Sequence, residues 1–170
     1  MTPDPSIRQA RIDRDYDELV RLISSSIDEA VDPMSHLVEL AWSQLQSSSV
    51  SWLGFYHLDE QTGHRQMLLG PHMDRPACSP IGMNGACGRA LEDQRTILIE
   101  DMAQIDPDQV IPCDPRDRSE IVIPCKSPEG LLCVLDLDSH EASAFSLQDD
   151  LGLRDCLVAA GFCLLEPSKT

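Results

Sequence analysis

Basic side chains are scarce in this 170-residue sequence, which has 13 Lys and Arg against 29 Asp and Glu and a formal net charge of -16. Binding to nucleic acid or to anionic membranes requires Lys and Arg to neutralise phosphates, so this balance argues against both partners. The sequence also lacks an apolar run of about 18 residues, so no membrane-spanning helix is predicted. The composition remains compatible with cationic or zwitterionic ligands.

Two further absences concern processing and metal binding. Met1 to Pro5 are polar, and no apolar segment typical of a secretory signal follows them, so we expect the protein in the cytoplasm. In that compartment cysteines stay reduced unless they cycle through a catalytic reaction. The seven cysteines include no C-x-x-C pair, which argues against a structural zinc site, and no metal or cofactor is predicted.

Hydrophobic periodicity predicts a single α+β domain over residues 1–170. Two helices are expected within about 13–47, a sheet with its loops at about 50–139, and a last helix at about 146–166. Asp32 followed by Pro33, and Ser146 followed by Asp149, are typical helix starts. Hairpins with helices gathered at the ends indicate an antiparallel sheet with helices packed on it. The last helix is expected to bury one stripe: Leu147, Leu151, Val158, Phe162 and Leu165.

Three cysteines lie in loops rich in Gly and Pro: Cys78, Cys87 and Cys113. Cys87 is near the expected N-terminus of a short helix, where the helix dipole lowers the pKa of a thiol. This place suits a resolving thiol and also makes Cys87 a rival nucleophile to Cys113. The other four cysteines lie in strand or helix patterns and are interpreted as small apolar residues: Cys125, Cys133, Cys156 and Cys163.

Carboxylates interrupt two apolar strand patterns at Glu120, Asp136 and Asp138. Asp136 and Asp138 share one face of their strand, because side chains alternate with a period of two. Acidic residues are unusual in such strands, although strand-end surface carboxylates are the alternative interpretation. Thiols for redox chemistry beside carboxylates for proton transfer and cation binding indicate a thiol-redox site.

Several short motifs follow one another over about residues 52–150: Trp52-Leu53-Gly54-Phe55-Tyr56, Leu69-Gly70-Pro71, Pro76-Ala77-Cys78, Gly85-Ala86-Cys87-Gly88, Cys113-Asp114, Ser119 to Pro124 and Val134 to Ser139. Their order resembles the GAF-domain free methionine-(R)-sulfoxide reductases. Just before Cys113 the sequence has Gln109-Val110-Ile111-Pro112, where the family usually has a segment containing histidine.

The resemblance implies a GAF-like sheet of about six antiparallel strands, with helices on one side and a pocket closed by loops on the other. It implies free methionine (R)-sulfoxide as the substrate and thioredoxin as the reductant, and proteins of this kind are often homodimers. Cys113 would be the nucleophile, Cys87 the main resolving thiol and Cys78 a second one. The pocket would be formed by three carboxylates and two aromatic residues: Glu120, Asp136, Asp138, Trp52 and Tyr56.

Two other functions compete with the reductase. A GAF-type sensor would bind a small molecule without turnover, and a cysteine-based sensor would respond to metal or redox state. Trp52 and Tyr56 lie four residues apart on one strand face, and core packing accounts for them equally well. One of the pocket carboxylates would pair with the substrate ammonium and another would protonate the sulfoxide oxygen, with Glu120 and Asp138 equal candidates for the donor. The five histidines have no identifiable partner and are interpreted as structural.

Overall fold

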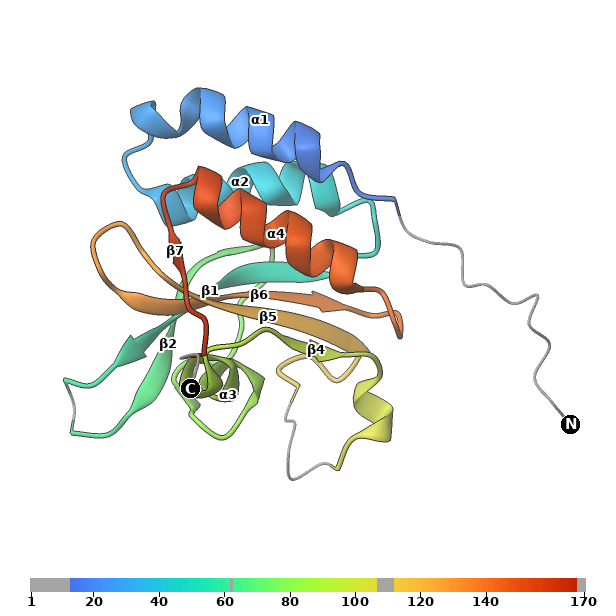
Figure 1. The fold of residues 1–170 in the computed structure, drawn as a ribbon. Coiled ribbons are helices and arrows are strands. Elements are labelled where there is room, and N and C mark those ends of the chain that lie inside the picture. Colours follow the sequence, from blue (N-terminus) through green and yellow to red (C-terminus); the bar gives the residue numbers. More distant parts are fainter. Residues whose placement is uncertain (1–12, 62, 107–111, 168–170) are drawn as a thin grey trace, which may run out of the picture.

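The computed structural model describes residues 13–61, 63–106 and 112–167. Within these ranges seven strands form one antiparallel sheet in the order β3-β2-β1-β6-β5-β4, and β7 also pairs with β5 (Figure 1). The strands are β1 (Trp52–Asp59), β2 (Gln66–Met73), β3 (Ile81–Gly82), β4 (Ile97–Ile99), β5 (Ser119–Lys126), β6 (Leu132–Ser139) and β7 (Cys163–Leu164). The expected antiparallel α+β architecture is confirmed, and the two-residue strands β3 and β7 are too short for periodicity to predict.

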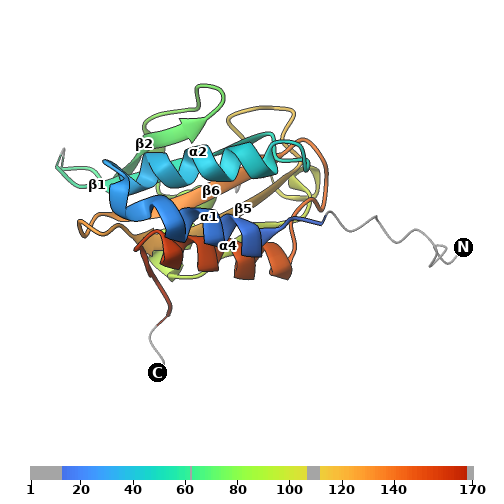
Figure 2. The ribbon, with the colours of Figure 1, turned by 90° about the horizontal axis from the view of Figure 1, so that it is seen from above.

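Helices lie on both faces of the sheet. In the described chain they are α1 (Tyr16–Ser26), α2 (Pro33–Leu45), α3 (Ala86–Asp93) and α4 (Leu147–Ala159), with 3-10 turns at Ile27–Glu29 and Met102–Gln104. Figure 2 shows α1, α2 and α4 side by side above the sheet, with α1 in contact with both of the others. The short α3 lies below the sheet among the loops (Figure 1). The three longer helices therefore share one side as expected, and α3 joins the loops on the other.

The helix starts follow from the local sequence. Asp32 caps α2 by accepting hydrogen bonds from the backbone N–H groups of Met34 and Ser35, and Pro33 occupies the first turn. Ser146 and Asp149 form a complete capping box at α4. Both predicted starts are confirmed, because each depends only on residues two or three positions apart.

Side-chain alternation divides the sheet into two apolar faces. Leu53 and Phe55 of β1 pack with the helices α1, α2 and α4, whereas Trp52 and Tyr56 of the same strand pack with α3. Phe55 stacks on Phe162, with ring centroids 5.2 Å apart. The helix-covered face forms the larger core, which leaves the opposite face available for a site.

The expected apolar stripe of α4 was wrong. Leu147, Leu151 and Val158 are 73%, 58% and 56% exposed, and the helix ends at Ala159 rather than near residue 166. The buried side of α4 consists of other residues: Asp149, Gly152, Leu153, Cys156 and Leu157. Gly152 sets this rotation, since a Cβ there would overlap the ring of Tyr16 in α1. Apolar residues occur on two sides of α4, so periodicity alone could not select the correct one.

The chain after α4 also differs from the expectation. Cys163 lies in β7, on the exposed surface, and not on a helix with Cys156. Phe162 is buried in the larger core, and Leu165 packs against the cluster on the opposite face. The interpretation as small buried residues holds for Cys125, Cys133 and Cys156 and fails for Cys163. Among the described residues, no helix has the length and apolarity needed to cross a membrane. Residues 109–111, which precede Cys113, lie outside the described ranges.

A buried ion pair joins the start of α1 to the start of α4. The Nη1 of Arg14 donates to Oδ1 of Asp149 at 2.7 Å and to the carbonyl of Ala144 at 2.9 Å. The Tyr16 hydroxyl donates to the same Asp149 oxygen at 2.8 Å. Burial, together with the Asp149 charge, raises the pKa of Tyr16 far above its usual value. The pair fixes where α1 crosses α4, because any shift between the helices would leave a buried charge without its partner.

Replacing Arg14 with Ala should lower the free energy of unfolding by about 3–5 kcal/mol, because the carboxylate of Asp149 would remain buried without its cation. Urea denaturation followed by circular dichroism measures this change. The matched control is Arg21→Ala, which removes an exposed ion pair with Glu18 and should leave the unfolding midpoint nearly unchanged. Equal midpoints for the two variants would contradict the structural role of Arg14.

Candidate functional site

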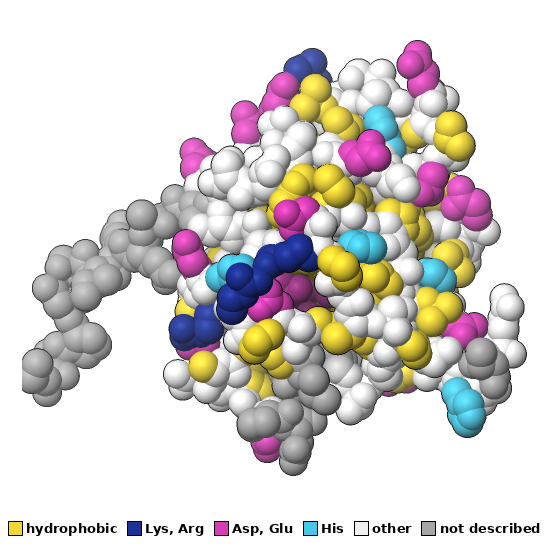
Figure 3. All heavy atoms as spheres, turned by 180° about the vertical axis from the view of Figure 1, so that it is seen from behind, with side chains coloured by type: hydrophobic (Ala, Val, Ile, Leu, Met, Phe, Trp, Pro, Cys, Tyr) yellow, Lys and Arg dark blue, Asp and Glu magenta, His cyan; other side chains and the backbone are white. Residues whose placement is uncertain are grey.

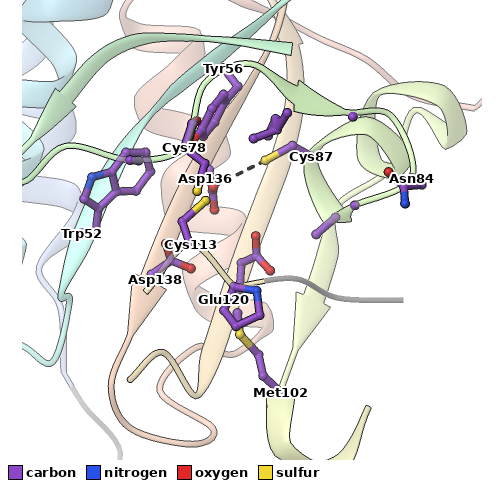
Figure 4. A pocket seen from close by; sticks show the side chains of 16 residues that line it. Trp52, Tyr56, Cys78, Asn84, Cys87, Met102, Cys113, Glu120, Asp136 and Asp138 are labelled. Carbon is purple, nitrogen blue, oxygen red and sulfur yellow. Dashed lines mark hydrogen bonds between the residues drawn. The ribbon is translucent and has the colours of Figure 1, made fainter. Parts of the chain in front are cut away.

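A cavity of about 260 Å³ lies on the face of the sheet that carries α3. Strands β1, β5 and β6 form its floor, and α3 and the loops that carry Cys78 and Cys113 surround it (Figure 4). All eight site residues expected from the sequence line it: Trp52, Tyr56, Cys78, Cys87, Cys113, Glu120, Asp136 and Asp138. Figure 3, seen from behind the view of Figure 1, shows acidic side chains in a hollow with basic side chains beside them.

Strand register explains why the three carboxylates meet. Glu120 of β5 lies directly opposite Asp138 of β6, and Asp136 is two residues further along the same face. Glu120 and Asp136 are 7% and 5% exposed. Burial, reinforced by the charge of Asp136, raises the pKa values of Glu120 and Asp138 well above the usual range. Burial raises the pKa of Asp136 to about 7. The group can therefore hold protons at neutral pH and would gain from a cation.

Cys87 occupies the second position of α3 and is buried against this carboxylate group. Its Sγ lies 3.4 Å from Oδ2 of Asp136. Burial, followed by the charges of Asp136 and Glu120, raises the pKa of the Cys87 thiol well above its usual value. The expectation that the helix N-terminus would lower this pKa was wrong, because desolvation and nearby carboxylates outweigh the dipole of an eight-residue helix.

Cys113 meets Cys78 at the mouth of the cavity. The Cys113 thiol contacts the thiol and backbone of Cys78 and the hydroxyl of Tyr56. Partial burial, together with the Cys78 thiol, raises the pKa of Cys113 to about 12. Both cysteines are exposed, in contrast to Cys87. The structure thus places Cys78, rather than Cys87, in contact with Cys113.

Aromatic side chains form one wall of the cavity. The rings of Trp52 and Tyr56 lie 6.1 Å apart and are both buried. The Tyr56 hydroxyl donates to the carbonyl of Cys78 at 2.9 Å, which ties the wall to the cysteine loop. A Cβ on Gly54 would lie 2.7 Å from the Trp52 ring and 2.5 Å from Cβ of His72, so only glycine lets the indole lie across the strand. These aromatic residues serve both core packing and the cavity wall.

Charged residues beside the cysteine motifs connect the two loops. Arg75 lies 3.4 Å from Asp114 and donates to the carbonyl of Ser51 at 2.9 Å. His140 lies 3.5 Å from both Asp114 and Asp117. A hydrogen bond from Arg116 holds the pKa of Asp114 well below its usual range, and burial raises that of Asp117. Except for His140, these charged residues are close to Cys78 or Cys113 in sequence, which was the available signal, but charged residues in loops are more often only solvated.

Iodoacetamide at neutral pH should alkylate Cys78 and Cys163 well before Cys87, because the first two are exposed and the third is buried with a raised pKa. Peptide mass spectrometry over a time course measures the order. Asp136→Asn removes one nearby charge and should speed the alkylation of Cys87, with Cys163 in the same sample as an internal control. A native Cys87 that reacts as fast as Cys163 would contradict this account.

Comparison with known proteins identifies the family. The model for the GAF domain matches residues 15–153. Free methionine-R-sulfoxide reductase of Escherichia coli is 31% identical over 147 residues, which are 85% of this chain and 81% of that protein. The enzyme of the same name from Saccharomyces cerevisiae is 31% identical over 120 residues, 68% of this chain and 65% of that one. A structure of free methionine-R-sulfoxide reductase from Neisseria meningitidis in complex with its substrate aligns with a TM-score of 0.74 at 27% identity, covering 85% of each chain. The chain therefore belongs to the GAF domain family, among the free methionine-R-sulfoxide reductases.

Proposed function

We propose that this protein reduces free methionine (R)-sulfoxide to methionine with its cavity thiols. The observation that carries the proposal is the arrangement of Cys113, Cys78 and three neighbouring carboxylates around a cavity of about 260 Å³. The similarity to reductases of that name supports the same substrate. The volume is at the small end for ligand pockets, which suits one amino acid better than a peptide.

Charge and shape account for substrate binding. The substrate ammonium would lie beside Asp136, Glu120 and Asp138 and would supply the positive charge that these carboxylates otherwise lack. The methyl and sulfur would lie against Trp52 and Tyr56, since sulfur and apolar groups pack well on aromatic rings. A substrate held by its ammonium at the carboxylates and by its methyl group at the aromatic rings would present its sulfoxide to Cys113 at the mouth of the cavity.

The reaction conserves atoms and electrons within the cavity. The Cys113 thiolate attacks the sulfoxide sulfur while a protonated carboxyl gives its proton to the oxygen, with Glu120 and Asp138 both suited by their raised pKa values. The oxygen ends on Cys113 as a sulfenic acid, and methionine leaves. A second thiol then attacks the sulfenic sulfur, forming a disulfide and releasing water. The two thiols thereby supply the two electrons that reduce the sulfoxide.

Contact favours Cys78 as the first resolving thiol. Its thiol already touches that of Cys113, whereas Cys87 lies against Asp136. Cys87, expected from the resemblance to be the main resolving thiol, would act second by exchange with Cys78. An external dithiol would then return the electrons by thiol–disulfide exchange, for which we propose thioredoxin. A cytoplasmic location and a homodimer remain predictions.

A non-catalytic GAF sensor is the second candidate, and one observation favours it. The pKa of Cys113 is raised to about 12, so the thiolate is rare in the ligand-free cavity. A sensor would bind methionine or its sulfoxide through the same carboxylates and leave it unchanged. A positive charge distinguishes the two, because in the reductase the substrate ammonium near Cys113 would favour its thiolate.

Reduced protein with dithiothreitol or thioredoxin should consume the R epimer of free methionine sulfoxide and leave the S epimer. Cys113→Ser should lower the rate to background, because serine is a far weaker nucleophile toward sulfur. The matched control is Cys163→Ser, which changes an exposed thiol outside the cavity and should keep the full rate. Binding without turnover in folded, reduced protein would establish the sensor instead.

Methionine should bind the Cys113→Ser variant more tightly at pH 8 than at pH 6. The pKa of Asp136 is raised to about 7, so its carboxyl gains the negative charge that attracts the ammonium as pH rises through 7. Because the Asp136 carboxyl releases one proton when methionine binds, the affinity can rise by at most about ten-fold per pH unit below that pKa. Trp52 fluorescence at the cavity wall reports binding. Asp136→Asn should flatten the dependence on pH, and an unchanged slope would contradict the role of Asp136.

A further inference from the structure

We propose that the reduced cavity also binds a zinc ion, with Cys87, Glu120 and Asp136 as its ligands. Zinc binding does not depend on the reductase activity. Its consequence, competition with the substrate, rests on the proposed function.

The positions of three ligand atoms carry the proposal. The Sγ of Cys87 and one carboxylate oxygen each of Glu120 and Asp136 all lie within 4.8 Å of one another, and Sγ is 3.4 Å from Oδ2 of Asp136. Tetrahedral zinc with bonds of about 2.0–2.3 Å holds its ligand atoms roughly 3.3–3.8 Å apart. Small side-chain movements would therefore complete the geometry. The ligands come from α3, β5 and β6, whose packing holds them in place.

A second observation points independently to a missing cation. Oδ1 of Asp136, a residue only 5% exposed, accepts no hydrogen bond from an N–H or S–H donor of the described residues, and only the neighbouring Glu120 carboxyl, when protonated, bonds to this carboxylate. A buried carboxylate oxygen without a donor or a metal is costly, so such atoms normally have a partner. Asp138 adds a third carboxyl on the same face of β6. The cavity thus offers a cation a buried ligand atom with two further carboxyls beside it.

The donor set selects the metal. One thiolate with two carboxylates matches zinc, which binds sulfur and oxygen in four-coordinate sites. Magnesium and calcium prefer six or more oxygen ligands and would gain nothing from Cys87. Binding displaces the proton of the Cys87 thiol to solvent, together with any proton held by the two carboxyls. Water can complete the four-coordinate site.

Zinc in this position would exclude the substrate. It would occupy the carboxylates proposed to hold the substrate ammonium, and it would retain Cys87 as a thiolate ligand. Competition should therefore appear as a higher KM for the sulfoxide and should reverse when a chelator is added. This would make the cavity responsive to free zinc as well as to methionine sulfoxide.

The test is a titration of the full, reduced protein with Zn²⁺ against a coloured zinc chelator, without substrate. We expect one tight zinc per chain. Loss of a direct ligand in Cys87→Ser should weaken binding by about 100-fold or more, given that even indirect partners of metal ligands are worth 10–100-fold. Glu120→Gln should also weaken zinc binding, and this variant replaces Cys87→Ser in the test if Cys87→Ser does not fold. Cobalt(II) in place of zinc should show the absorption of a thiolate ligand in the native protein and lose it in Cys87→Ser.

Two controls separate the alternatives. Cys163→Ser alters an exposed thiol and should bind zinc normally. His140→Ala disrupts the other cluster with ligand spacing, Asp114, Asp117 and His140, and should also bind normally. Zinc affinity that survives in Cys87→Ser, or is lost in His140→Ala, would overturn the proposal. Because binding is measured without turnover, an active reductase that ignores zinc would refute this inference alone, and a zinc-binding protein without turnover would refute only the proposed reaction.

Discussion

Mutual repulsion among three carboxylates on one buried sheet face governs the chemistry of this protein. Glu120 and Asp138 lie opposite each other across β5 and β6, and Asp136 follows on the same face. Water is largely excluded there, so the charges interact strongly and a proton or a cation must offset them. Burial beside these carboxylates raises the thiol pKa of Cys87, and the same arrangement creates the demand for an ammonium group or a metal ion.

The two faces of the sheet divide stability from function. Leu53 and Phe55 of β1 face α1, α2 and α4, which form the larger core, while Trp52 and Tyr56 face the cavity. Because side chains alternate along a strand, neighbouring residues serve packing on one face and the cavity on the other. The well-packed face covered by helices thus stabilises a sheet whose opposite face carries unfavourable charges. The ion pair between Arg14 and Asp149 lies on the helix side, outside the residues that line the cavity.

Local rules predicted much of this molecule from its sequence. The caps of α2 and α4 and the shared face of Asp136 and Asp138 depend on spacings of two to four residues, which the chain alone determines. The predictions that were wrong concern features that contacts between residues far apart in the sequence determine. The rotation of α4 depends on Gly152 against Tyr16, and the thiol pKa of Cys87 depends on carboxylates from other strands. No spacing rule indicated these contacts, nor the link between Arg75 and Asp114.

Because the thiols of the ligand-free cavity are protonated, they resist oxidation by peroxides. Peroxides attack thiolates, and further oxidation to sulfinic acid is irreversible for most proteins. Partial burial and the Cys78 thiol raise the pKa of Cys113 to about 12, so its thiolate is rare in the ligand-free cavity. The contact between the two thiols at the cavity mouth therefore protects the nucleophile from hydrogen peroxide as long as no ligand is bound.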